Sequence, residues 1–301
     1  MVTWDEWRAG ATHIEVGGLA IATYDLGPAG APTYTFCHGY PSASLDIAGV
    51  AAQLDGLRLL ALDMPGFGAS DKPPADQGGG GHIYSIHAAA DAVEALWAAK
   101  GTARTLLVAH DYSVSVAQEL LARRAEGTLA DGTLGPATDI TGVVWMNGGL
   151  YPDLHRPTPG QQLLLDPDHG AEVAAAVDEA AFTNGLRGTW GERRPFDEAA
   201  AREIFRSMDD GGGVALMHDL LHYVADRRAH ADRWRSALEG ADLPTVFVWG
   251  LLDPVSGGHV VPRLVDHVPQ GRIVALDDVG HWPPLEAPDD VAAEIAALAT
   301  V

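Results

Sequence analysis

The hydrophobic positions along the chain follow two alternating periods. Apolar runs of roughly 4–8 residues, typical of buried strands, alternate with stretches in which apolar residues recur every three or four positions. This alternation predicts an α/β fold, in which helices cross over between the strands of a mostly parallel sheet. The expected strands are 12–25 (a hairpin turning near Gly17 and Gly18), 34–37, 57–62, 104–109, 140–146, 245–249 and 272–276.

Helical spacing is clearest in residues 85–99, where Ile86, Ala90, Val93 and Leu96 fall on one face. Further helices are expected at 114–124, directly after a strand, and at 290–298. Residues 73–81 include four consecutive glycines, which indicates a flexible surface loop.

Strand signals stop between residues 148 and 240, and the pattern there indicates helices and loops. A helical insertion between two core strands is expected to cover the carboxyl ends of the strands, where open α/β sheets bind ligands. We therefore expect a core formed by residues 1–147 and 241–301, and a helical cap formed by residues 148–240.

Charge and composition narrow the possible partners. The 301 residues carry a net charge of −22, which disfavours binding to nucleic acids and anionic membranes and leaves a small molecule as the expected partner. The single cysteine, Cys37, excludes an internal disulfide and is expected to be inert packing. The absence of a long apolar run and of a signal-peptide core predicts a cytoplasmic protein. Abundant alanine, with arginine preferred over lysine, suggests a bacterial source.

A turn between a predicted strand and a predicted helix contains the first candidate for chemistry. The segment 109–113 has small residues, Ala109 and Ser113, two positions either side of Asp111, as in a nucleophile elbow. The following helix would favour a negative charge there because of its dipole. Two alternatives are that Ser113 is the nucleophile and that Asp111 only caps the helix.

Two further candidates follow later strands. Asp253 comes after the strand at 245–249, and His281 comes after the strand at 272–276. The order nucleophile, acid, histidine is the order of the α/β-hydrolase fold, in which the acid orients the histidine that serves as base. We therefore expect a catalytic triad of Asp111, Asp253 and His281.

Other polar motifs change this expectation little. The turn 38–41 contains Gly39, which allows a backbone N–H to face a reacting centre. The glycine-rich segment 63–71 lacks the Gly-Lys-Ser/Thr ending of a nucleotide-binding loop. His218 and His222 have the spacing of zinc ligands, but no glutamate follows His218 and no third ligand is evident. We expect neither a metal nor an organic cofactor.

Several segments resemble the aspartate-nucleophile branch of the α/β-hydrolase family, which contains epoxide hydrolases and haloalkane dehalogenases. The closest resemblance is to mesoderm-specific transcript-like hydrolases, and it extends from about residue 12 to residue 298. It implies a mostly parallel eight-stranded sheet flanked by helices, with a helical cap. The segments that carry it are 82–86, 110–112, 116–120, 147–149, 155–157 and 252–255.

The resemblance also implies roles for individual residues. The backbone N–H groups of Tyr40 and Tyr112 would form the oxyanion hole. Tyr223 resembles a cap tyrosine that donates a hydrogen bond to an epoxide oxygen, and Tyr151 is the other tyrosine of the region. Asn147 follows the strand after which some dehalogenases place their acid, and because an amide cannot be that acid, Asp253 is preferred. The expected substrate contacts are His38, Tyr151, Tyr223, Asn147 and Trp282.

The same resemblance favours epoxide opening. Dehalogenases usually carry tryptophan after the nucleophile and asparagine in the oxyanion loop, whereas this chain has Tyr112 and Tyr40. We expect Asp111 to form a covalent ester with an epoxide and His281 to activate the water that releases a diol. Three alternatives remain: dehalogenation of haloalkanes or haloacids, hydrolysis of esters or lactones, and a non-catalytic ligand-binding role.

Overall fold

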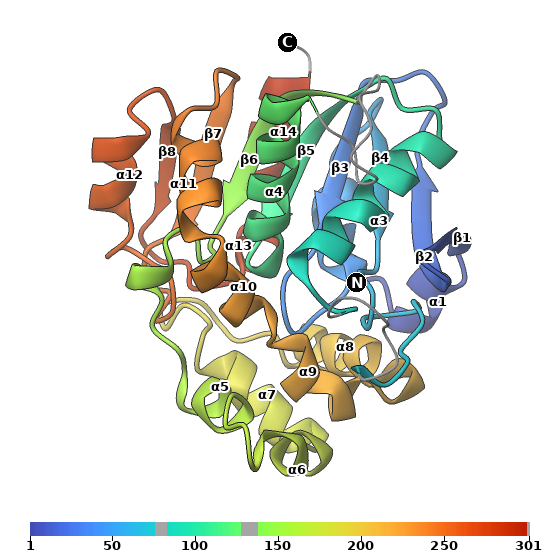
Figure 1. Ribbon diagram of the computed structural model, residues 1–301, viewed down its shortest axis with the longest axis vertical. Helices are drawn as coiled ribbons and strands as arrows, with labels where there is room; N and C mark the ends of the chain where they lie inside the picture. Colours follow the sequence, from blue (N-terminus) through green and yellow to red (C-terminus); the bar gives the residue numbers. More distant parts are fainter. Residues whose placement is uncertain (76–82, 128–137, 300–301) are drawn as a thin grey trace.

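The computed structural model describes residues 1–75, 83–127 and 138–299, so most of the loop expected at 73–81 lies outside the described residues. Eight strands form one open sheet in the order β1-β2-β4-β3-β5-β6-β7-β8 (Figure 1). Pairs β1–β2 and β2–β4 are antiparallel, and the other neighbours are parallel. The strands are β1 (Thr12–Val16), β2 (Leu19–Leu26), β3 (Thr33–Cys37), β4 (Arg58–Leu62), β5 (Arg104–His110), β6 (Asp139–Met146), β7 (Thr245–Gly250) and β8 (Arg272–Leu276).

Successive residues of the central strand β5 pack on opposite faces of the sheet. Leu106 and Val108 belong to one hydrophobic core, and Leu107 and Ala109 belong to the other. Both faces are buried, which explains why β5 is a continuous apolar run and does not alternate with polar residues. The predicted α/β fold with a mostly parallel eight-stranded sheet is confirmed.

Helices cover both faces of the sheet. The helices α3 (Ile86–Ala99), α4 (Tyr112–Glu126) and α11 (Ala231–Glu239) pack together in front of the sheet, and α14 (Pro288–Ala299) packs on β5, β6 and β7 from behind (Figure 1). Ser85 caps α3 by accepting a hydrogen bond from the N–H of Ala88 at 3.1 Å. The remaining core helices are α1 (Trp4–Arg8), η1 (Ser44–Ile47), α2 (Ala48–Ala51), α12 (Val261–His267) and α13 (Pro283–Glu286).

The chain between β6 and β7, all of which is described, contains helices and connections but no strand. Helices α5 to α9 gather beyond one end of the sheet, and α10 and α11 lead back along α4 (Figure 1). This arrangement fits the expected cap, whose boundaries at 148 and 240 remain a prediction. The elements are η3 (Pro152–Leu154), α5 (Pro159–Leu164), α6 (Gly170–Ala175), α7 (Glu179–Arg187), α8 (Glu198–Asp209), η4 (Asp210–Leu216), α9 (Met217–Leu220) and α10 (Tyr223–Ala229).

Within the described part of the chain, we find no helix that combines the length and the apolar character needed to cross a bilayer.

The packing of β5 gives a prediction for stability. Leu107 is fully buried in the centre of the sheet, so Leu107→Ala should leave a cavity and lower the free energy of unfolding by about 3 kcal/mol. The matched control Leu163→Ala, at a residue that is 59% exposed, should cost less than about 0.5 kcal/mol. Urea denaturation followed by circular dichroism measures both changes, and equal losses would contradict the assigned core.

Candidate active site

The connection from β5 to α4 bends sharply at Asp111. Its φ of 45° and ψ of −102° make it the only non-glycine residue with positive φ among those described. Glycines make room for the bend: a side chain at Gly148 would approach the carbonyl oxygen of Asp111 to 2.6 Å, and one at Gly39 would approach its Cβ to 3.1 Å. The N–H of Asp111 donates to the carbonyl oxygen of Asn147 at 2.8 Å. Helix α4 therefore begins at Tyr112, two residues earlier than the periodicity indicates, and the Asp111 side chain makes no capping hydrogen bond.

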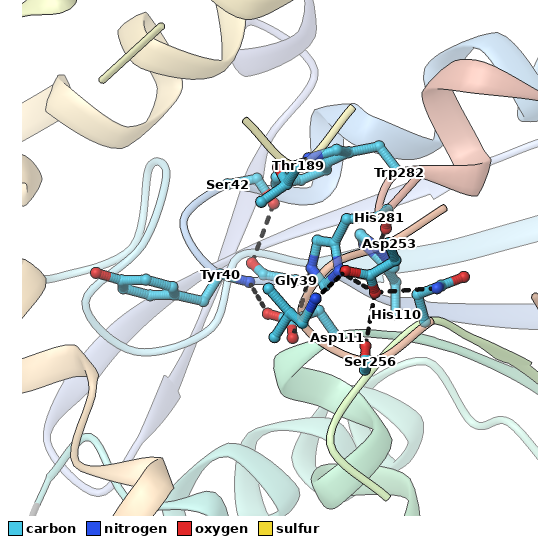
Figure 2. Close-up of polar contacts among 12 residues, drawn as sticks. Gly39, Tyr40, Ser42, His110, Asp111, Thr189, Asp253, Ser256, His281 and Trp282 are labelled. Atoms are coloured by element: carbon cyan, nitrogen blue, oxygen red, sulfur yellow. Dashed lines mark hydrogen bonds and ion pairs between the residues drawn. The ribbon is translucent and has the colours of Figure 1, made fainter. Parts of the chain in front are cut away.

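Asp111, Asp253 and His281 lie together at the carboxyl ends of their strands (Figure 2). His281 Nδ1 lies 2.8 Å from Asp253 Oδ2, and His281 Nε2 lies 3.6 Å from Asp111 Oδ1. All three side chains are at least 94% buried. The imidazole therefore stands between two carboxylates, with one nitrogen facing each.

One of the two expected oxyanion donors contacts the carboxylate of Asp111. The N–H of Tyr40 donates to Asp111 Oδ2 at 3.1 Å, while its phenol ring extends away from the carboxylate (Figure 2). Tyr112 is the first residue of α4, so its N–H has no acceptor within the helix. One oxygen of Asp111 is thus held by a backbone donor and the other faces His281.

Several donors converge on the carboxylate of Asp253. The Val255 N–H donates to Oδ1 at 2.7 Å, and the Ser256 hydroxyl donates to Oδ2 at 2.7 Å. The Asn147 amide donates to Oδ2 at 3.0 Å. Burial alone would raise the pKa of Asp253, but the charge of His281 and these hydrogen bonds hold it well below its usual range. Asp253 is therefore ionised.

Opposing effects set the charge of His281. Burial alone would lower its pKa, but the negative charges of Asp253 and Asp111 outweigh burial and raise the pKa above its usual value. His110, the residue before the bend, donates through Nε2 to the carbonyl oxygen of His281 at 2.8 Å. Burial lowers the pKa of His110 to about 4, so this histidine is neutral.

The loop that carries His281 is held by a buried carboxylate that sequence reasoning missed. Glu286 accepts hydrogen bonds from the N–H groups of Gly280 and Trp282, at 3.0 Å each, and of Gly191 at 2.8 Å. Thr189 accepts from the His281 N–H at 2.8 Å through its carbonyl oxygen. The cap segment 189–191 is therefore joined to the His281 loop, and no periodicity in the sequence indicates this contact.

A cavity of about 270 Å³ opens beside His281. Its wall is mainly aliphatic and aromatic, with side chains contributed by α5, α6 and α7, and it includes no lysine, arginine or carboxylate. Trp282 lines it as expected of a substrate contact, but its indole N–H already donates to Thr189 Oγ1 at 2.9 Å. This space accommodates an uncharged, largely apolar molecule.

Tyr223 of α10 packs against the rings of Tyr40 and Tyr112, the two residues with the expected oxyanion donors. Its ring centroid is 5.9 Å from that of Tyr40 and 5.2 Å from that of Tyr112. Burial, together with the charge of Asp111, raises the pKa of Tyr223 above its usual value, so the phenol retains its proton. The hydroxyl group is buried and has no hydrogen-bond partner among the described residues.

Three expected substrate contacts occupy other positions. Both ring nitrogens of His38 are bonded to backbone groups, one to the Gly39 carbonyl oxygen at 2.7 Å and the other to the Met64 N–H, after β4, at 3.0 Å. The Asn147 amide bonds to Asp253 and to the backbone of Gly250 at 2.7 and 2.8 Å, so it faces the acid and not the cavity.

The position of Tyr151 likewise does not fit the substrate contact expected of it. Its ring packs against His267, with centroids 6.3 Å apart, and lies under the guanidinium of Arg263. It lines a separate surface hollow with residues of α10, α11 and α12. Tyr151 therefore lies outside the lining of the cavity beside His281.

The alternative nucleophile and the histidine pair with zinc-ligand spacing form hydrogen bonds or ion pairs within the protein. The Ser113 side chain is fully buried, and its hydroxyl donates to the His38 carbonyl oxygen at 2.6 Å. His218 bonds to the Leu164 carbonyl oxygen at 2.6 Å, and His222 lies 3.4 Å from Asp226.

Cys37 is buried in β3 as expected. The described residues include no group of three His, Cys, Asp or Glu side chains arranged to hold a metal ion.

Comparison with known proteins identifies a matching family and several relatives of this chain. Residues 36–294 match the model of the alpha/beta hydrolase family. The chain is 33% identical over 285 residues to a hydrolase called LipZ from Mycobacterium tuberculosis, covering 94% of this chain and 93% of LipZ. It is 31% identical over 294 residues to the human mesoderm-specific transcript homolog protein, covering 94% of this chain and 83% of that protein.

A solved structure with the same fold is the haloalkane dehalogenase DbeA from Bradyrhizobium elkani USDA94. The two superpose with a TM-score of 0.77 at 20% identity, covering 96% of this chain and 97% of the other.

The contact between Asp253 and His281 predicts a measurable shift. Asp253→Asn removes the first of the negative charges that oppose the effect of burial, so the pKa of His281 should fall. The control Asp277→Asn removes an exposed carboxylate four residues before His281 and should leave that pKa unchanged. Titration of the His281 ring by NMR measures both. An unchanged pKa in Asp253→Asn would contradict the observed pairing.

Proposed function

This chain belongs to the alpha/beta hydrolase family, and from that premise we propose that it is an epoxide hydrolase that converts epoxides to diols through an ester on Asp111. The observation that carries the proposal is the Asp111 carboxylate on its strained bend, with Oδ2 held by the Tyr40 N–H and Oδ1 3.6 Å from His281. Asp111, Asp253 and His281 are the proposed catalytic residues.

In the proposed first step, Asp111 Oδ1 attacks an epoxide carbon. A carbon–oxygen bond forms, the ring carbon–oxygen bond breaks, and the alkoxide takes a proton from a donor. Oδ2 becomes the carbonyl oxygen of the ester, still bonded to the Tyr40 N–H. A carboxylate is ionised at neutral pH, since its reference pKa is about 3.9, and so needs no base for this attack.

Tyr223 is the proposed donor to the epoxide oxygen. Its hydroxyl is protonated and has no acceptor among the described residues, so a substrate oxygen would satisfy it. Its ring packs against those of Tyr40 and Tyr112, the two residues whose N–H groups are the proposed oxyanion donors. No second tyrosine is assigned to this task.

In the proposed second step, water hydrolyses the ester. His281 Nε2 accepts the proton of a water molecule that attacks the ester carbonyl carbon, and the N–H groups of Tyr40 and Tyr112 stabilise the oxyanion. The oxyanion then collapses, the bond between the carbonyl carbon and the alcohol oxygen breaks, and His281 returns the proton to the departing diol. One such donor is typically worth about 3 kcal/mol. Asp253 holds the imidazole and stabilises its positive charge, and Asn147 and Ser256 fix Asp253. Asn147 therefore has a positioning role in this proposal.

Dehalogenation is the second candidate, because an aspartate nucleophile also displaces halide and because DbeA has the same fold. A halide leaving group needs N–H donors to replace its hydration. Trp282 is the only tryptophan that lines the described cavity, and its indole N–H is already bonded to Thr189. This arrangement supports epoxide over halide as the leaving group.

The ester route predicts where oxygen from water goes. Under single turnover of styrene oxide in ¹⁸O-labelled water, the label should enter the Asp111 carboxylate and not the diol, as measured by mass spectrometry of the Asp111 peptide. Asp111→Asn should lower turnover by about 10⁴-fold or more, while Asp277→Asn serves as the control. Label found only in the diol would rule out the ester. A broad epoxide panel without turnover, combined with halide release from haloalkanes, would favour dehalogenation.

The ester also changes the charge around His281, which predicts a pH dependence. Ester formation neutralises Asp111, one of the carboxylates that raise the pKa of His281, so this pKa should fall in the intermediate. The rate of ester hydrolysis should decline as the pH falls through that lower pKa, because protonated His281 cannot accept a proton. Rapid-quench measurements across pH give this value for comparison with the NMR titration of the free protein. If the rate of ester hydrolysis declined with an apparent pKa equal to or above that of His281 in the free protein, the mechanism would be contradicted.

A further inference from the structure

A buried arginine from the cap contacts the nucleophile bend. Arg227 of α10 is only 2% exposed. Its Nη2 donates to the backbone carbonyl oxygen of Asp111 at 2.8 Å, and its Nε donates to the Ser115 hydroxyl at 2.7 Å. A side chain at Gly149 would overlap the guanidinium, so the backbone leaves room for it. Arg227 therefore links the cap to the first turn of α4.

Burial of the Arg227 guanidinium at this position is not expected to stabilise the fold. Among the described residues, no carboxylate forms an ion pair with Arg227, although burying an unpaired charge costs several kcal/mol. The guanidinium also lies at the N-terminal end of α4, where the helix dipole disfavours a positive charge. The neighbouring Asp226 is turned away, accepting a hydrogen bond from the N–H of Ile86 at 2.8 Å.

The contacts of Arg227 converge on the groups assigned to the first chemical step. It holds the carbonyl oxygen of the one described non-glycine residue with positive φ, a conformation that persists only when the surroundings impose it. Its guanidinium carbon also lies 4.5 Å from the ring centroid of Tyr223, one helical turn earlier in α10. One side chain thus fixes the backbone of the nucleophile and packs on the proposed proton donor.

We propose that Arg227 is a positioning residue through which the cap holds Asp111 in its bend and aligns Tyr223 above it. The planar guanidinium can reach the Asp111 carbonyl oxygen and the Ser115 hydroxyl simultaneously, whereas a lysine ammonium supplies the charge without this geometry. The assignment of the first chemical step rests on the proposed function, but the hold on the bend does not. The two parts are therefore tested separately.

The first test needs no substrate. Amide hydrogen exchange at residues 112–115 is measured in the full-length wild type, Arg227→Met, Arg227→Lys and the control Arg228→Met, which removes the adjacent exposed arginine of the same helix. Exchange should accelerate by about 10-fold or more in Arg227→Met, to a lesser degree in Arg227→Lys, and not at all in Arg228→Met. If Arg227→Met does not fold, Ser115→Ala replaces it, because that change removes one of the two anchors. Unchanged exchange in the folded variants would overturn the proposal.

The second test separates the two chemical steps in a His281→Gln background, in which the ester should accumulate. With styrene oxide, Arg227→Met should slow ester formation by about 100-fold with less than about a 3-fold change in substrate affinity, and Arg227→Lys should recover part of the rate. Equal rates for Arg227→Met and Arg228→Met would overturn the assignment to the first step. Absence of any ester in the His281→Gln parent would instead count against the proposed function, and the exchange experiment would still decide whether Arg227 holds the bend.

Discussion

The backbone bend at residue 111 constrains the segments around it. A non-glycine residue at positive φ is costly, so neighbouring groups must fix it: the carbonyl oxygen of Asn147 accepts from its N–H, and Arg227 donates to its carbonyl oxygen. Glycines at 39 and 148 are required because any side chain there would collide with the bend or with His110. The residues that directly follow β3, β5 and β6, namely His38-Gly39, Asp111 and Asn147-Gly148, therefore lie together at one edge of the sheet.

Charges of alternating sign occupy the interior behind this bend. Asp253, His281 and Asp111 stand in sequence, and Arg227 contacts the backbone of Asp111 from the other side. Each charge would be costly to bury alone, but each has an opposite neighbour or several hydrogen bonds. Glu286 is stabilised differently, since its carboxylate is surrounded by peptide N–H groups. Removing the charge of Asp253 or Asp111 consequently lowers the pKa of His281.

The sequence predicted what depends on periodicity and chain order. The strands at β3 to β8 follow apolar runs, and Asp111, Asp253 and His281 could be selected because each follows such a run in a parallel sheet. The directions of side chains in loops and in the cap could not be predicted, since they depend on how distant segments meet. His38, Asn147 and Tyr151 were expected to contact substrate. Instead, His38 bonds to backbone groups of Gly39 and Met64, Asn147 bonds to Asp253, and Tyr151 lines a separate hollow. The hold of Arg227 on the bend depends in the same way on where α10 meets α4.

The contact between residues 189–191 and the His281 loop has a consequence for protein engineering. Gly191 and Gly280 approach so closely that a side chain on either would overlap the other backbone, and Thr189 and Glu286 complete the junction with hydrogen bonds. A chimaera that exchanges the helices over the cavity for those of a relative would replace one half of this junction and keep the other. Segments 189–191 and 280–286 therefore form a single module, which must be transplanted together if the histidine is to keep its orientation in a redesigned pocket.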